Sequence, residues 1–404
     1  MKFGHKLGLL GALYFSQGLP YGFFTQALPA LLRKEGVSLP AIGASSLLAL
    51  PWALKFLWAP LVDRWYSPRW GRRRSWILPL QWAAILTLCG LGAFVRADQL
   101  TAMMIAILVL NLLAASQDIA TDGLALDLLA PAERGLANGL QVAGYRAGMI
   151  IGGGLLLVLY ERLGTAGTFY GMAGLLALAT LPITFTQEPR AAAAEPRSHS
   201  HPPEGHFLRR PQVLPVLALV VIYKAGEAFA SGMLRPFLTD LGLSLEDLGW
   251  MLGTVGFVSG LLGALTGGHL SQRLGRRRAL VGLGVVQAIA VAGYGAVALT
   301  PGGPGRVVLY AACAFEHFAS GMATAALFTC MMDWSRKEVS ATDYTVQASL
   351  VVIATGLAAT LSGASAGALG YPLHFALATG LALLAVGAAA WLFPVRGPFA
   401  EVGA

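Results

Sequence analysis

Long apolar runs alternate with short polar loops along the 404 residues of this chain. A helix of about 20 apolar residues crosses the hydrocarbon core of a bilayer, where backbone polar groups must be satisfied internally. Charged residues make up only 12% of the sequence, against roughly 25% in soluble domains. We therefore predict an all-α membrane protein. The twelve predicted spans are 7–32, 39–62, 74–95, 100–124, 134–159, 166–187, 212–238, 246–270, 278–298, 306–332, 341–368 and 371–394.

The stretch 188–211 between the sixth and seventh spans is rich in Pro, Ala, Ser and charge. Such a composition does not build a packed core. We expect a cytoplasmic linker there, joining an N-terminal six-helix half (1–187) to a C-terminal six-helix half (212–396), with 397–404 as a cytoplasmic tail.

The two halves repeat with an offset of 206 residues. The segment 36–43 matches 242–249, and the same offset pairs Tyr21 with Glu227 and Asp127 with Asp333. Several matches at one offset predict two pseudo-symmetric halves related by an axis along the membrane normal, a known transporter architecture.

Basic residues give the chain a net charge of +8 and lie in the short loops. With both ends inside, the inner loops and tails hold nineteen Lys and Arg residues, and the outer loops hold five, plus Arg235 near a span end. The positive-inside rule then predicts that both termini and the linker are cytoplasmic. This distribution argues against nucleic-acid binding.

Related basic motifs follow the second and eighth spans. The first contains Asp63-Arg64 and then 71–74 (Gly-Arg-Arg-Arg), and the second runs from Gly268 through Gln272-Arg273 to 275–278 (Gly-Arg-Arg-Arg). The second resembles the cytoplasmic G-x-x-x-D-R-x-G-R-R signature of the major facilitator superfamily, with Gln272 in place of the usual Asp. The first departs further, because Ala59 replaces a glycine and 65–70 lengthens the gap. The resemblance implies a twelve-helix fold and a gating role for these loops, with Asp63 and Arg64 as a latch pair.

Within the superfamily the chain is similar to the branch containing AmpG-type muropeptide permeases, acetyl-CoA transporters and RhtX/FptX-type siderophore permeases. The segments that carry this similarity are 54–64, 115–119, 133–135, 144–149 and 316–326. The opening segment 16–29 looks closer to the siderophore permeases, and twelve spans without an insert differ from the longer AmpG type. The resemblance favours a siderophore as substrate, with a muropeptide or an acyl-CoA-type solute as alternatives.

Carboxylates lie inside the fourth span. Asp118 and Asp122 follow Asn111 at spacings of seven and four, which place all three on one helical face. Ionisable groups at membrane depth are costly and usually functional. Lys55 reaches the same depth from the second span, so we predict a Lys55–Asp118 pair that either rearranges during transport or is static. Asp122 is either a proton-coupling group or a wet helix-end residue, and we expect Asp127 in the loop.

Other spans also carry polar residues. Arg146 lies near the middle of the fifth span and needs an anionic partner, either a carboxylate or a substrate. Gly144, Gly148 and Gly152 at four-residue spacing predict close approach of another helix. Glu227 lies near the middle of the seventh span.

Polar stripes run along several of these helices, with Tyr14, Gln17, Tyr21 and Thr25 in the first span and Glu316, Ser320 and Thr324 in the tenth. His317, next to Glu316, is either a proton relay or a structural residue. Interface anchoring explains most of the tryptophans that flank the second and third spans, and we assign them no site role: Trp52, Trp58, Trp65, Trp70 and Trp76.

These patterns predict a secondary active transporter of the bacterial inner membrane, with a central site and rocking halves. We expect proton-coupled uptake of an organic anionic or chelating solute such as a siderophore. The predicted partners are this solute, protons and the lipid bilayer, and we expect a monomer without cofactor or metal. The absence of a G-x-x-x-x-G-K-[ST] loop argues against ATP as the energy source. Two other classes are disfavoured. An intramembrane enzyme would need a nucleophile or metal motif, which this sequence lacks, and a membrane scaffold or receptor would not need polar stripes along its helices.

The candidate residues fall into three groups. The predicted substrate-binding residues are Gln17, Tyr21, Thr25, Arg146, Lys224, Glu227, Ser231, Glu316 and Ser320. The predicted proton-coupling residues are Asp118, Asp122, Glu227, Glu316 and His317. The predicted gating residues are Lys55, Asp63, Arg64, Arg72, Arg73, Gln272, Arg273 and Arg276.

Overall fold

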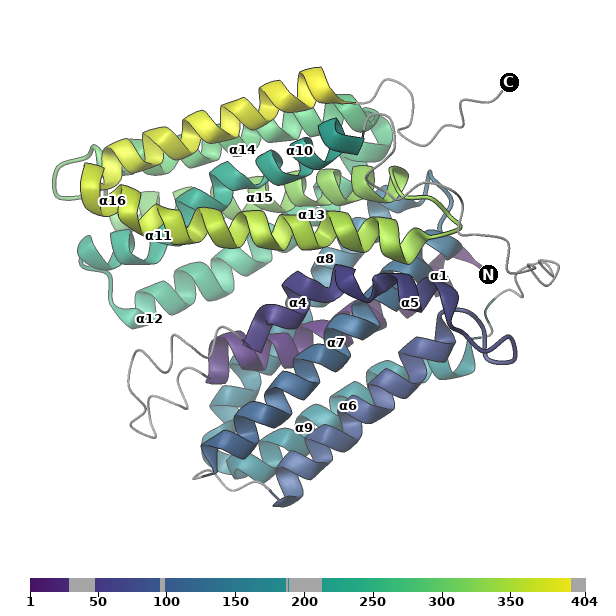
Figure 1. Ribbon diagram of the computed structural model, residues 1–404. Coiled ribbons are helices and arrows are strands. Elements are labelled where there is room, and N and C mark those ends of the chain that lie inside the picture. Colours follow the sequence, from purple (N-terminus) through teal and green to yellow (C-terminus); the bar gives the residue numbers. More distant parts are fainter. Residues whose placement is uncertain (29–47, 95–98, 187, 189–212, 394–404) are drawn as a thin grey trace, which may run out of the picture. The chain divides into compact units, whose positions relative to one another are not determined.

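The computed structural model describes residues 1–28, 48–94, 99–186, 188 and 213–393 (Figure 1). The chain forms two compact units. The first comprises Met1–Leu129, Ala143–Pro202 and Lys337–Ser349, and the second comprises Ala130–Val142, Pro203–Arg336 and Leu350–Ala404. The repeat match at 36–43 and most of the predicted linker lie outside the described residues. The predicted boundary between the halves therefore stays a prediction.

The first unit is a helical bundle in which α6 and α7, and α6 and α9, pack together (Figure 1). Its elements are α1 (Phe3–Gly22), η1 (Phe23–Ala27), α4 (Leu50–Leu54), η3 (Lys55–Leu57), α5 (Ala59–Arg64), α6 (Arg74–Phe94), α7 (Leu100–Leu128), η4 (Ile151–Leu155) and α9 (Leu156–Phe185). It shares α8 (Arg134–Ile150) and α16 (Ser340–Leu392) with the second unit.

The second unit is also helical, and α15 packs against both α13 and α14 (Figure 1). Its elements are α10 (Val213–Tyr223), α11 (Ala225–Asp240), α12 (Leu245–Leu248), η6 (Gly249–Val255), α13 (Gly256–Arg273), α14 (Arg276–Ala298) and α15 (Arg306–Asp333), with parts of α8 and α16.

Two long helices each contain a break between predicted spans. In α16 the break at Gly370 (φ 74°) joins the eleventh and twelfth predicted spans, and in α9 the break at Gly164 (φ 64°) joins the end of the fifth to the sixth. Both angles lie in the left-handed region that glycine adopts without steric cost. Within the described residues, twelve helices have seven residues or more, and seven are long and apolar enough to cross a membrane. The predicted twelve-helix, all-α fold is confirmed.

The second predicted span is not continuous in its described part. Pro60 lies in the first turn of α5, where its ring and missing N–H prevent the normal hydrogen bond to the carbonyl of Phe56. The helix therefore changes to the 3₁₀ segment η3, and Lys55 sits at the interruption. Three π-helical segments, η1, η4 and η6, interrupt other spans, and such segments frequently occur at functional sites.

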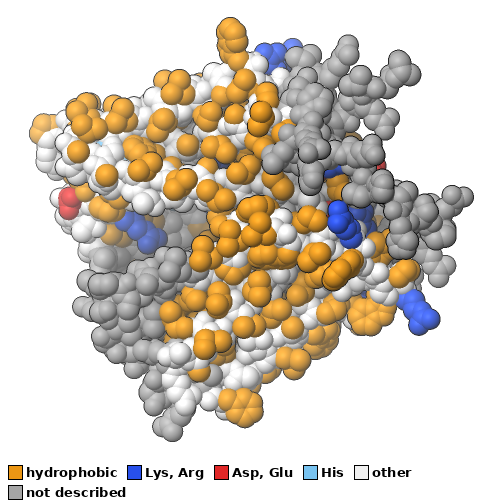
Figure 2. All heavy atoms as spheres, in the orientation of Figure 1, with side chains coloured by type: hydrophobic (Ala, Val, Ile, Leu, Met, Phe, Trp, Pro, Cys, Tyr) orange, Lys and Arg blue, Asp and Glu red, His pale blue; other side chains and the backbone are white. Residues whose placement is uncertain are grey.

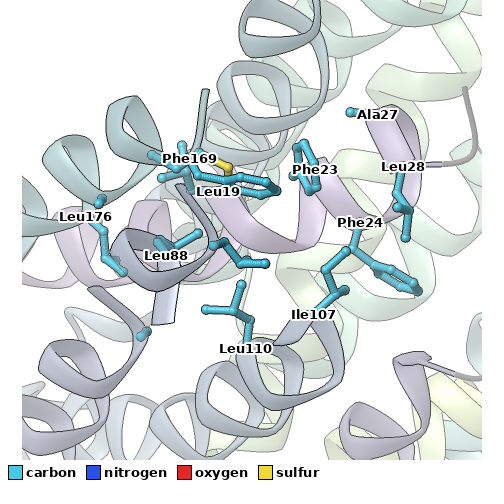
Figure 3. Packing of buried hydrophobic residues seen from close by; sticks show 14 of the residues in the cluster. Leu19, Phe23, Phe24, Ala27, Leu28, Leu88, Ile107, Leu110, Phe169 and Leu176 are labelled. Atoms are coloured by element: carbon cyan, nitrogen blue, oxygen red, sulfur yellow. The ribbon is translucent and has the colours of Figure 1, made fainter. Parts of the chain in front are cut away.

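The core of the first unit contains large apolar side chains from five helical elements, α1, η1, α6, α7 and α9. Figure 3 shows Leu19 and Phe23 facing Phe169, with Leu88, Ile107 and Leu110 nearby. The Phe23 and Phe169 rings meet edge to face with centroids 5.3 Å apart. The face seen in Figure 2 carries many hydrophobic side chains. This surface suits a lipid environment.

Candidate functional site

A buried ion pair lies at the interruption of the second span. The Lys55 ammonium is paired with the Asp118 carboxylate of α7, and the two residues are 3% and 8% exposed. The Lys55 nitrogen also lies 5.7 Å from the centroid of the Trp52 ring, within cation–π range. The predicted Lys55–Asp118 pair is confirmed, and its part in transport stays a prediction.

One helical turn further along α7, Asp122 accepts a hydrogen bond from the hydroxyl of Tyr14 at 2.9 Å. Asp122 is 2% exposed, and α7 continues to Leu128, so the alternative of a wet helix-end residue is wrong. Asp118 and Asp122 thus place two carboxylates in the buried part of α7, one paired with Lys55 and the other bound by Tyr14.

The predicted substrate-binding residues of the first unit differ in their surroundings. Gln17 is fully buried, and Tyr21 is half-buried with its ring 5.7 Å from that of Tyr145. Thr25 is exposed and donates a hydrogen bond to the carbonyl of Tyr21 in its own helix. Arg146 is half-buried on α8. The structure thus brings Tyr21 to α8 and leaves Thr25 bound to its own helix.

The second unit has its own lysine–carboxylate pair at a helix interruption. Lys224 separates α10 from α11, and its ammonium lies 2.7 Å from Glu227 Oε2. The hydroxyls of Thr324 and Ser320 on α15 lie 3.0 and 3.4 Å from the Lys224 ammonium, and Ser320 also donates to Glu227 Oε1 at 3.3 Å. Three of the predicted substrate-binding residues, Lys224, Glu227 and Ser320, are therefore in direct contact.

The predicted Glu316–His317 group is also assembled. Glu316 is 4% exposed, and its Oε2 lies 2.9 Å from His317 Nδ1, which is 3.6 Å from Cys313 Sγ. A side chain at Gly256 would overlap the His317 ring, because a Cβ there would lie 2.7 Å from Nε2. Ser231 lies outside these groups and donates to the carbonyl of Ala228 in its own helix.

The gating loop of the first unit is organised by Asp63. Its Oδ1 accepts hydrogen bonds from Arg72 at 2.9 Å and Arg73 at 2.8 Å, and its Oδ2 accepts from the backbone and hydroxyl of Thr342 at 2.8 and 2.6 Å. Arg64 is exposed. The predicted Asp63–Arg64 latch is therefore wrong, because Arg72 and Arg73 supply the positive partners.

Arg73 is completely buried and extends this network. It donates to Asp127 Oδ2 at 2.8 Å and to the Ser340 hydroxyl at 2.7 Å, and Ser340 donates in turn to Asp127 Oδ1 at 3.1 Å. Asp127 lies in the last turn of α7, which corrects our expectation of a loop residue. The beginning of α16 is thus tied to α7 and to the loop before α6.

The second unit contains a corresponding network around Asp333, the last residue of α15. Its Oδ1 accepts from Arg134 at 2.7 Å and its Oδ2 from Arg276 at 2.6 Å. Gln272 is half-buried and Arg273 is exposed. A Cβ at Gly135 would lie 2.7 Å from Gln272 Cγ, so Gln272 packs at the start of α8.

Several members of these networks were not predicted as site residues: Tyr14, Asp127, Arg134, Asp333, Ser340 and Thr342. The repeat could have indicated four of them, because the offset that pairs Asp127 with Asp333 also pairs Arg134 with Ser340. Nothing in the local sequence indicates that Thr342 would bind Asp63.

Interface anchoring does not explain every tryptophan near the second span. Trp52 is 7% exposed and donates to Asn111 Oδ1 at 3.0 Å, and half-buried Trp58 donates to Ser116 Oγ at 3.0 Å. Trp52 is an exception to interface anchoring, whereas Trp65 and Trp70 are exposed as expected. Among the described side chains, no group of three or more His, Cys, Asp or Glu residues could hold a metal ion.

Charged pairs buried at helix interruptions are typical of secondary transporters. A family description for acetyl-coenzyme A transporter 1 matches residues 6–162, and that of the Major Facilitator Superfamily matches residues 216–403. The anhydromuropeptide permease of Escherichia coli strain K12 is 32% identical over 353 residues, which cover 86% of this chain and 72% of that protein. An uncharacterized protein of Haemophilus influenzae is 30% identical, covering 98% of this chain and 96% of that protein.

The solved structure of FucP, a major facilitator superfamily transporter in the outward conformation, has a TM-score of 0.71 at 15% identity. The match covers 96% of this chain and 98% of that structure, and at this identity it shows the fold alone. The chain belongs to the AmpG-like branch of the major facilitator superfamily. It is a multi-pass membrane transporter and not an enzyme. These relatives favour our muropeptide alternative and give no support to the siderophore.

Proposed function

We propose that this protein is a proton-coupled permease that takes up a muropeptide, a saccharide carrying a peptide, across the bacterial inner membrane. The identity to an anhydromuropeptide permease over most of the chain supports the substrate class. The observation that carries the transport mechanism is that each unit pairs a buried lysine with a carboxylate where a helix is interrupted.

The second unit offers a site for an anionic group of the substrate. Lys224 is held by Glu227 and by hydroxyls on α15. Protonation of Glu227 would remove its charge and free the Lys224 ammonium to bind a carboxylate of the peptide. The site would then exchange one anionic partner for another, and the substrate carboxylate would restore the counter-charge that the buried ammonium needs.

The first unit offers a site for the transported proton. Asp118 is paired with Lys55, and one turn further along α7 Tyr14 donates a hydrogen bond to the Asp122 carboxylate. Uptake of one proton by Asp122 would remove one negative charge from this buried region. Desolvation favours the neutral group over the charged one in a low-dielectric interior.

The proposal includes the orientation and assembly of the protein. Both termini lie in the cytoplasm, as the distribution of Lys and Arg predicts. The Asp63 and Asp333 networks then lie on the cytoplasmic side, where they would gate the inner opening. The transporter works as a monomer, because one chain supplies both lysine sites.

Uptake by purified protein in liposomes tests this function. We expect a labelled anhydromuropeptide to accumulate when the pH gradient is inward, and a protonophore to abolish the accumulation. Glu227→Gln and Asp122→Asn should each remove the dependence on the pH gradient, whereas exposed Glu338→Gln should leave it unchanged. Accumulation that does not depend on the pH gradient would exclude proton coupling, and the absence of any uptake would exclude this substrate.

The family match over residues 6–162 favours one second candidate, an acyl-coenzyme A thioester. Excess acetyl-coenzyme A in the same liposomes separates the two candidates. A muropeptide permease should keep its uptake rate, and a thioester transporter should show competition by the thioester and no muropeptide uptake.

A further inference from the structure

Three aromatic rings from three helices of the first unit meet at one place. They belong to Tyr21 of α1, Trp52 of α4 and Tyr145 of α8, and we call them the aromatic corner. The Tyr21 centroid lies 5.3 Å from that of Trp52 and 5.7 Å from that of Tyr145, and the Trp52 and Tyr145 centroids are 6.3 Å apart. The rings are inclined at 76°, 46° and 79° in the same order, so they form a corner and not a stack.

The Trp52 ring of this corner is fixed from two sides. Its indole N–H donates to Asn111 Oδ1 at 3.0 Å, and the Lys55 ammonium lies 5.7 Å from its ring centroid. Small residues, Ala114 and Ala115, pack against it. The hydrogen bond to Asn111 and the nearby Lys55 ammonium therefore fix the position of the indole. The rings of Tyr21 and Tyr145 lie next to it.

Near the corner, the Gln17 amide and the hydroxyls of Tyr21 and Tyr145 lack hydrogen-bond partners among the described residues. Gln17 lies one helical turn before Tyr21 and is 0% exposed, yet its side-chain N–H and carbonyl groups make no hydrogen bond within the described part of the chain. Tyr21 and Tyr145 are half-buried, and no hydroxyl hydrogen bond joins them to other described residues. A buried amide without hydrogen-bond partners destabilises the protein, so this arrangement favours a ligand that supplies both donors and acceptors.

The chemistry of the corner fits a sugar ring. A pyranose has faces of C–H groups that lie against aromatic rings, and hydroxyl and acetamido groups at its edge that bind amides and phenols. An apolar ligand would leave Gln17 unsatisfied, and water alone would satisfy Gln17 without using the rings. We propose that the aromatic corner, together with Gln17, is a subsite for the saccharide part of the substrate. This inference rests on the proposed muropeptide function and adds the region that recognises the sugar.

The subsite is tested by calorimetric binding to the full-length purified protein, with two separate probes. One probe is the anhydro-disaccharide of a muropeptide without its peptide, and the other is the free peptide. We expect Tyr21→Ala, Tyr145→Ala and Gln17→Leu each to weaken disaccharide binding about tenfold, which corresponds to about 1.4 kcal/mol. Peptide binding should stay within about twofold of the parent value, because the peptide contacts other residues.

Two control variants separate a loss of binding contacts from a loss of structure. Tyr145→Phe keeps the ring and should retain disaccharide binding better than Tyr145→Ala. Tyr170→Ala removes an exposed tyrosine of α9 in the same unit and should bind both probes like the parent protein. The inference is overturned if the parent protein binds no disaccharide, if the corner variants bind it normally, or if both probes weaken equally.

Tryptophan fluorescence of the parent protein tests the subsite if the alanine variants fail to fold. Disaccharide binding should change the tryptophan fluorescence of the parent protein, and Trp52→Phe should remove most of that change. An unchanged signal in Trp52→Phe would overturn the subsite. The two proposals fail separately: muropeptide uptake with no effect of the corner on disaccharide binding refutes only the subsite, whereas corner-dependent disaccharide binding without muropeptide uptake refutes only the transported substrate.

Discussion

Arg134 and Ser340 are equivalent residues in the repeat, and each contacts an aspartate in the last turn of a helix of the other repeat. Arg134 donates to Asp333 Oδ1 at 2.7 Å, and Ser340 donates to Asp127 Oδ1 at 3.1 Å. Both pairs of equivalent residues, 134 with 340 and 127 with 333, are 206 positions apart. The helices α8 and α16, which begin at these two residues, each pass from one unit into the other. The two networks therefore tie each unit to a helix that continues outside it.

The two aspartates should differ in their importance for stability. Asp333→Asn leaves Arg134, 5% exposed, and Arg276 without the carboxylate that both bind. Asp127→Asn leaves Arg73 paired with Asp63. We expect Asp333→Asn to lower the free energy of unfolding by about 3–5 kcal/mol, and Asp127→Asn by about 1–2 kcal/mol. Unfolding in detergent measures both variants, and equal losses would contradict the difference in remaining partners.

The Lys55–Asp118 pair allows its structural and transport roles to be separated. Lys55→Met should destabilise the protein by about 3–5 kcal/mol, because it leaves Asp118 buried without its ammonium partner. The double variant Lys55→Met with Asp118→Leu should recover most of this loss. If the pair rearranges during transport, the stable double variant should bind substrate but not accumulate it. Normal accumulation by the double variant would show that the pair is static.

The close contact of α1 and α8 should exclude side chains larger than hydrogen. A Cβ at Gly148 would lie 2.2 Å from the carbonyl oxygen of Phe15, which confirms the predicted close approach at this glycine. We expect Gly148→Ala to destabilise the protein by about 1–3 kcal/mol through overpacking.

Gly174→Ala is the matched control for this close contact. Gly174 lies inside α9, and a Cβ there would meet no atom within 4 Å. Because alanine is the better helix former, this change should stabilise the protein by up to about 1 kcal/mol. Thermal unfolding of both variants measures the difference, and a loss of the same size at both glycines would refute the packing argument.

Glu188 predicts a pH dependence of stability at the loop before α6. Its carboxylate accepts hydrogen bonds from the backbone N–H groups of Arg73 and Arg74. Burial nevertheless raises the pKa of Glu188 above its ordinary value of 4.5, against the opposing effect of these N–H groups. The folded protein therefore holds this proton more tightly than the unfolded chain does.

The stabilising contribution of Glu188 should therefore be greatest below pH 4.5 and decrease as the pH rises through the raised pKa. Glu188→Gln keeps a hydrogen-bond acceptor and removes the titration. We expect the melting temperature of the parent protein minus that of the variant to decrease as the pH rises across that window and to be constant above it. An increase of this difference with pH would contradict the raised pKa.

The orientation in the membrane can be tested with single cysteines. The variants Ser67→Cys and Pro301→Cys place a thiol in the α5–α6 and α14–α15 loops, after Cys89, Cys313 and Cys330 have been replaced by alanine. In intact cells, an impermeant maleimide should label Cys at 301 and leave the thiol at 67 unlabelled until the membrane is opened. The reverse pattern would place both termini outside the cytoplasm.

The sequence determined the class of this protein because the length and polarity of its helices are local properties. Runs of apolar residues predicted the all-α membrane fold, and the motifs at 63–74 and 268–278 predicted the superfamily. The Lys55–Asp118 pair was also predictable, since a buried charge needs a partner at the same depth. The resemblance of 16–29 to siderophore permeases favoured a siderophore, whereas the comparison over most of the chain favours the muropeptide alternative.

Only the tertiary structure decided which partners the charged residues take. Asp63 binds Arg72, Arg73 and Thr342 and not its neighbour Arg64, because contacts depend on where helices pack and not on distance along the chain. The burial of Trp52 and the unsatisfied amide of Gln17 likewise follow from packing among α1, α4, α7 and α8. An apolar run shows that a helix enters the membrane, but its buried face depends on neighbouring helices that are distant in the sequence.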